Sequence, residues 1–106
     1  VTPVTALKAL SYTWNAGEVK ITFNKAPEAV SGIGVAASGA DINITTTGGA
    51  TTWTAVVSGN VLILTPDSGN FVTGDTIAIA STLKGADGTA ANAVSIVLGT
   101  TPATLP

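Results

Sequence analysis

The stretch TTWTAVVS-GN-VLILT, residues 51–65, constrains the fold more than any other part of the chain. Two runs rich in β-branched and aromatic residues flank Gly59 and Asn60, and a two-residue loop of this kind is typical of a tight β-hairpin. The hairpin predicts two cross-strand pairs on one face, Val57 with Leu62 and Ala55 with Leu64, with Trp53 on the same side.

The other face of this hairpin is apolar as well, because it carries Val56, Val61 and Ile63. A strand that is apolar on both faces belongs in the middle of a packed structure or against a neighbouring molecule. We therefore expect each face of the hairpin to have a partner.

Alternation of apolar and polar residues recurs along the rest of the chain. The stretch EVKITFN, residues 18–24, places Val19, Ile21 and Phe23 on one face, which we expect to point inward. The stretch 6–14 places Leu10, Tyr12 and Trp14 on one face in the same way. Further strands are expected at residues 33–37, 41–47, 76–82 and 92–98, with turn residues between them.

The number and spacing of these strands predict the fold class. Seven to nine short strands in a chain of 106 residues indicate one all-β domain, an antiparallel Ig-like β-sandwich. We expect the sandwich to span residues 1–99 and the Thr/Pro-rich residues 100–106 to form a linker. The chain begins with Val rather than Met, so we expect it to be a fragment of a longer protein.

Composition excludes several classes of function. A net charge of −2 and the lack of a basic cluster argue against nucleic-acid binding, which requires Lys and Arg at the phosphates. No apolar run approaches the roughly 18 residues of a membrane helix, so we expect no membrane insertion. A chain without Cys, His or Met, with 9% charged residues and abundant Thr, Ala and Gly, is typical of a domain exported to the bacterial cell surface.

Three stretches carry a resemblance to a known family. VKITFNKA (residues 19–26), LILTPDSGNFVTGDTIAIAS (62–81) and LKGADGTAA (83–91), in this order, resemble the bacterial Ig-like domains of S-layer and other cell-surface proteins. The chain departs from that family at Ile77, where an aromatic residue is frequent, and at the turn 84–88. The resemblance implies a tandem structural module without catalytic residues.

The carboxylates do not predict catalysis. Without His or Cys, a hydrolase would need paired carboxylates or a Ser–Lys pair. The carboxylates fall almost entirely in predicted turns, where Asp bonds its own backbone; they are Glu18, Glu28, Asp41, Asp67, Asp75 and Asp87. We expect no enzyme, no catalytic residue and no cofactor.

Calcium is the one metal that the sequence leaves open. Asp67, Asn70 and Asp75 share one loop, and Asp87 lies in the turn after the following strand. Calcium requires six or more converging oxygen ligands, and the D-x-D-x-D-G spacing is absent. Turn formation is the preferred interpretation of these side chains, and a calcium site is the alternative.

The large aromatic residues allow two interpretations. Tyr12, Trp14 and Trp53 could stack on a sugar, or they could pack between the two sheets. Tyr12 and Trp14 share a face with Leu10, and Trp53 shares the inward face of the hairpin, which favours packing in the core.

A covalent crosslink is a further hypothesis. Lys8 and Asn92 lie in the first and last predicted strands on their apolar faces, an arrangement that some bacterial surface sandwiches use for an isopeptide bond. Both residues lie near strand ends, and no carboxylate is clearly inward beside them, which favours an exposed Lys8.

The leading hypothesis from the sequence is a non-catalytic spacer, stalk or lattice module of a bacterial cell-surface or S-layer protein. Its expected partners are neighbouring domains of the same parent chain. The alternative is an adhesin or carbohydrate-binding module that binds a cell-surface glycan or a receptor protein through the loops 25–32 and 66–75 or through an exposed Trp.

Overall fold

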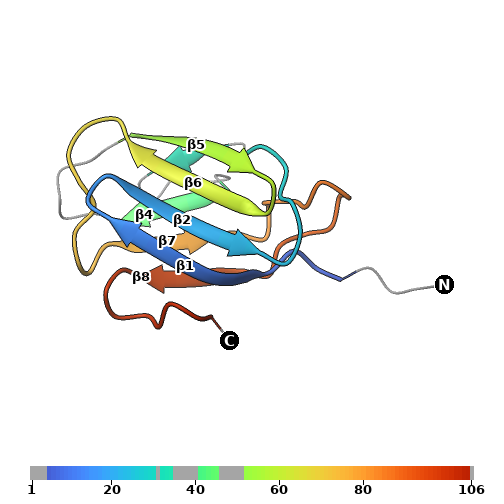
Figure 1. The fold of residues 1–106 in the computed structure, drawn as a ribbon. Coiled ribbons are helices and arrows are strands. Elements are labelled where there is room, and N and C mark those ends of the chain that lie inside the picture. Colours follow the sequence, from blue (N-terminus) through green and yellow to red (C-terminus); the bar gives the residue numbers. More distant parts are fainter. Residues whose placement is uncertain (1–4, 31, 35–40, 46–51, 106) are drawn as a thin grey trace.

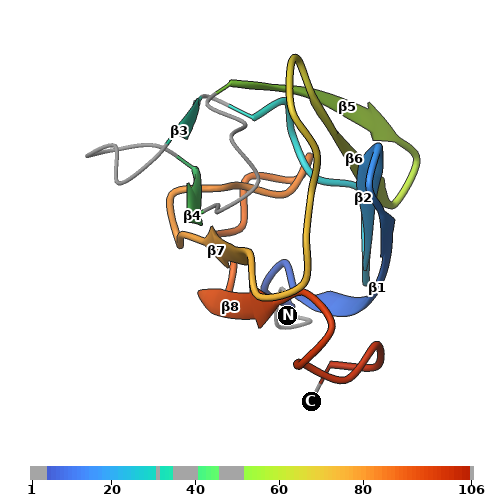
Figure 2. The same ribbon diagram turned by 90° about the vertical axis from the view of Figure 1, so that its left-hand side faces the viewer.

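The computed structural model describes residues 5–30, 32–34, 41–45 and 52–105, and every regular element in these ranges is a β-strand. Two sheets face each other as the layers of a sandwich (Figures 1 and 2). The eight strands are β1 (Ala9–Asn15), β2 (Glu18–Phe23), β3 (Ile33–Gly34), β4 (Ile42–Thr45), β5 (Trp53–Ser58), β6 (Val61–Pro66), β7 (Thr76–Ile79) and β8 (Val94–Val97). The predicted all-β sandwich of seven to nine strands is confirmed.

The strand order is β1-β2-β6-β5 in one sheet and β3-β4-β7-β8 in the other. All neighbours pair in antiparallel fashion except β3 and β4, which form a short parallel pair. Figure 2 shows the two sheets nearly edge-on, with β1 and β8 at the same side of the sandwich. Residues 35–37 and 46–47 of the predicted strands lie outside the described residues.

The core follows from the alternation of the sequence. Val19, Ile21 and Phe23 of β2 are at most 1% exposed, as predicted for the inward face of that strand. Ile77 and Ile79 of β7 face them from the other sheet in one continuous cluster of buried residues. Burial of apolar side chains between two sheets is the main favourable contribution to such a fold.

The β5–β6 hairpin has the predicted register, with Val57 opposite Leu62 and Ala55 opposite Leu64. Gly59 adopts φ +60°, the left-handed conformation that a tight two-residue turn requires. The outward face of the hairpin is only partly covered. Val56 is 51% exposed, so among the described residues this face lacks the partner that was expected for it.

Strand β1 differs from its predicted alternation. A register shift lies between Ala9 and Ser11, so that Ala9 and Tyr12 both face the core while Leu10 is 40% exposed. An inserted residue in one strand of an antiparallel pair moves the following side chains to the opposite face. The prediction that Leu10 shares the buried face of Tyr12 was therefore wrong.

Candidate functional site: the seam between the sheets

The chain enters the sandwich along the side where the two sheets meet. Leu7 forms a parallel bridge with Ala91, just before β8. The Leu7 N–H donates to the Ala90 carbonyl (3.3 Å), and the Asn92 N–H donates to the Leu7 carbonyl (2.9 Å). The Leu7 side chain is fully buried. This stretch thus belongs to the edge of the second sheet although it leads directly into β1 of the first.

Asn24 fixes the same stretch from the side of the first sheet. Its Oδ1 accepts a hydrogen bond from the Lys8 N–H (2.9 Å), and its Nδ2 donates to the Ala6 carbonyl (2.9 Å). The Asn24 backbone N–H donates to the Lys8 carbonyl (3.0 Å). One side chain therefore supplies hydrogen bonds that a straight β-ladder would otherwise provide, at the point where the chain crosses between the sheets.

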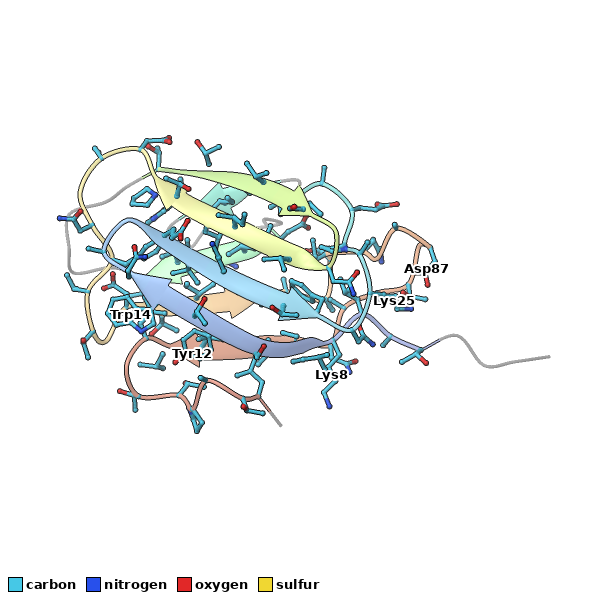
Figure 3. The ribbon with its side chains drawn as sticks, viewed as in Figure 1. Lys8, Tyr12, Trp14, Lys25 and Asp87 are labelled. Carbon is cyan, nitrogen blue, oxygen red and sulfur yellow. The ribbon has the colours of Figure 1, made fainter. Side chains whose placement is uncertain are left out.

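An ion pair closes this end of the sandwich. Lys25 Nζ lies 2.8 Å from Asp87 Oδ2, and it also donates to the Thr5 carbonyl. Thr89 donates to Asp87 Oδ1 through its hydroxyl (2.6 Å) and its backbone N–H (3.1 Å). The Lys25 ammonium, and then Thr89, hold the pKa of the Asp87 carboxyl well below its ordinary value. Figure 3 shows Lys25 and Asp87 together at the end where the N-terminal stretch enters.

We call these three groups of residues, 5–8, 24–25 and 87–92, the seam. The first group precedes β1, the second follows β2, and the third precedes β8. They join the two sheets through backbone hydrogen bonds, the side-chain amide of Asn24 and the ion pair between Lys25 and Asp87. The seam is not predicted by the sequence pattern. Its only local signal is the Asn that ends the alternating run of β2.

A second set of contacts, at the edge of β1, is made by residues 101–105, which we call the C-terminal segment. It runs back along β1, with Thr104 opposite Ser11 in an antiparallel bridge. The Tyr12 N–H donates to the Ala103 carbonyl (2.9 Å), and the Leu105 N–H donates to the Leu10 carbonyl (2.8 Å).

Two side chains anchor this segment. Leu105 is only 7% exposed and belongs to the core cluster. The Tyr12 hydroxyl donates to the Thr101 carbonyl. The residues expected to form a linker from position 100 onward are therefore packed on the sandwich up to Leu105, because β1 offers them a free edge and the core offers room for one Leu.

The aromatic residues lie mainly in the core. Tyr12 and Trp53 are 4% and 7% exposed, so neither offers a flat face to a sugar. Trp14 is half-buried against the core, near the end of β1 (Figure 3). A platform made of all three rings is not present, and Trp14 alone retains part of its surface.

The candidate calcium ligands do not converge. Asp67 accepts a hydrogen bond from the Thr54 hydroxyl (2.8 Å), and the buried Asp75 accepts one from the Val72 N–H (3.0 Å). The loop 66–75 and Asp87 lie at opposite ends of the sandwich (Figures 1 and 3). Among the described residues, no three Asp, Glu, His or Cys side chains form a group that could hold a metal ion.

The residues of the crosslink hypothesis are both exposed. Lys8 points away from the sandwich in Figure 3, and Asn92 is also at the surface. An isopeptide bond requires the amine and the amide to meet in a shielded environment, and the seam does not bring these two side chains into one.

Comparison with protein-family models, with curated proteins and with solved structures finds no match for this chain. The described part of the chain encloses no pocket. It also contains no helix of the length and apolar character needed to cross a membrane.

Proposed function

We propose that this domain is a non-catalytic structural module, a spacer, stalk or lattice unit of a bacterial cell-surface protein. Its partners are neighbouring domains of the same parent chain, and its role is to hold them apart under load. The observation that supports this proposal is the seam, because it connects the entering chain to the last strand through parallel bonds.

The direction of the strands decides how such bonds respond to force. Residues 6–8 run parallel to residues 90–92, and β8 then continues toward the opposite end of the sandwich (Figure 1). Once the C-terminal segment has come away from β1, a force that pulls residue 5 one way and residue 99 the other way slides these stretches along each other. The bonds of Leu7, with those of Asn24 beside it, then share the load, and they must fail together rather than one after another.

The proposal can be tested by single-molecule pulling between introduced thiols, since the chain has no native Cys. Handles at T5C and T100C load the seam lengthwise. Handles at T54C and T65C, which are opposite each other in the β5–β6 hairpin, peel that hairpin open and serve as the control. We expect a clearly higher rupture force for the first pair, and equal rupture forces would overturn the mechanical role.

The ligand-binding alternative depends on Trp14, the aromatic residue that retains partial exposure. Its test is fluorescence with acrylamide quenching in the presence of a panel of glycans, on the wild type and on W14F. We expect no additive to protect the emission. Protection by a glycan that is lost in W14F would replace the structural proposal with a binding module.

A further inference from the structure

The C-terminal segment is attached to β1 by a small set of contacts. Its backbone makes two hydrogen bonds with the backbone of Leu10 and Tyr12 and accepts a third from the Tyr12 hydroxyl, and Leu105 supplies the buried side chain. Without this segment, the β1 edge would expose an unpaired N–H and an unpaired carbonyl beside an open apolar position. An edge with these features is a template for another strand.

The connection before the segment is a tight reversal. Gly99 adopts φ +81°, and the N–H groups of Thr100 and Thr101 both donate to the Val97 carbonyl (3.1 and 2.8 Å). A Cβ on Gly99 would lie 2.7 Å from Thr73 Cγ2, so this turn is also closely packed. Pro102 follows at once. Short, constrained hinges before a strand favour exchange of that strand between identical chains.

We propose that the β1 edge is a strand-acceptor site for the C-terminal segment of a second copy of this chain. The occupant follows from the structure itself, because the intramolecular segment shows which sequence fits the edge, Thr-Pro-Ala-Thr-Leu with its Leu in the core. The exchanged contacts are identical to the intramolecular ones, so exchange costs only the opening of the turn at Gly99 and the ordering of two chains. The inference rests on the proposed structural role for its setting, and its test uses no force, so the two can fail separately.

Chain length limits how the two copies can be arranged. In an exchanged pair, residues 101–105 lie on the acceptor chain, so only the stretch from Leu98 to Thr101 bridges the two copies. Fully extended, these three steps span about 10 Å, at about 3.4 Å per residue. The β1 edge of the neighbour must therefore lie directly beside the end of β8. Reciprocal exchange gives a closed dimer, and one-way exchange gives an open row.

The test uses the non-hydrogen-bonded pair Ser11 and Thr104, which face each other across the bridge. The flanking bonds identify this pair type, in which the two Cα atoms approach to about 4.5 Å and a disulfide can form. The S11C and T104C variants of the chain are mixed, incubated at high concentration and oxidised. A disulfide between two different chains then forms where a segment has crossed over, in addition to those formed by random collision. We expect the mixed dimer to increase with time and concentration.

A mixture of T13C and K20C is the matched control, because these positions also face each other but belong to the β1–β2 hairpin. Its crosslinks report random collisions. The double variant S11C/T104C, oxidised at low concentration, should give a closed monomer that no longer exchanges. Mixed dimer at the control level would overturn the proposal, and so would a double variant that fails to close, because the segment would then not lie on β1.

Discussion

Removal of the Asn24 amide is the sharpest test of the seam. In N24A, the Lys8 N–H and the Ala6 carbonyl each lose a partner at 2.9 Å. Each such bond contributes about 1 kcal/mol net, so we expect the free energy of unfolding to fall by about 2 kcal/mol. A domain of this size has roughly 5–15 kcal/mol in total, so this loss is a substantial share.

Urea unfolding followed by tryptophan fluorescence measures the effect. With a slope of about 2 kcal/mol per molar urea, the midpoint of N24A should fall by about 1 M. N15A is the matched control, because the Asn15 Oδ1 accepts a single bond from the Gly17 N–H (2.8 Å) in an exposed turn. We expect N15A to lose at most about 0.5 kcal/mol. If both variants shift equally, Asn24 is an ordinary turn residue and the seam does not hold the sheets together.

Three further predictions concern single side chains. A carboxyl whose pKa is lowered in the fold stabilises the protein at a pH above about 4, the pKa that the group has in the unfolded chain. This contribution is lost as the pH falls toward the pKa that the group has in the fold. Urea midpoints of the wild type should therefore fall more steeply than those of D87N below about pH 5, and parallel slopes would contradict the Asp87 ion pair. In G59A the free energy of unfolding should fall by about 1 kcal/mol, because alanine disfavours φ +60°. G17A, at an ordinary φ, should change it by less than about 0.5 kcal/mol. Equal losses would rule out the backbone conformation as the cause. In L105A the free energy of unfolding should fall by about 2 kcal/mol, the low end for a buried Leu, because a peripheral site relaxes around the missing side chain. The exposed L10A should lose less than about 1 kcal/mol. A neutral L105A would show that the C-terminal segment is not anchored.

The local part of the fold could be predicted from the sequence. The alternation of residues 18–24 and the Gly59-Asn60 turn each act over a few residues, so the burial of β2 and the register of the hairpin followed directly. The shift in β1 could not be predicted in this way. Two apolar residues, Ala9 and Leu10, are adjacent at this point, and alternation alone does not decide which of them faces the core. The inserted residue is recognisable only when β1 is aligned with Phe23 and Thr22 of its partner strand.

The seam and the C-terminal segment could not be predicted because their contacts join distant parts of the chain. Leu7 gives no sign that it pairs with Ala91, and Thr/Pro-rich composition is as suitable for a linker as for an edge strand. The one hint in residues 101–105 is Leu105, a single apolar residue with no period to support it. Composition describes what a segment can do in isolation, whereas the free edge of β1 determines what it does in the fold.

The bond from Tyr12 to Thr101 spans 89 residues of sequence, which has a consequence for the way the chain is made. During synthesis the first strands emerge long before the residues that close the sandwich, and contacts between such distant residues form slowly. The core therefore cannot be completed until almost the whole domain has left the ribosome. The domain therefore folds as a unit only after its last strand has arrived.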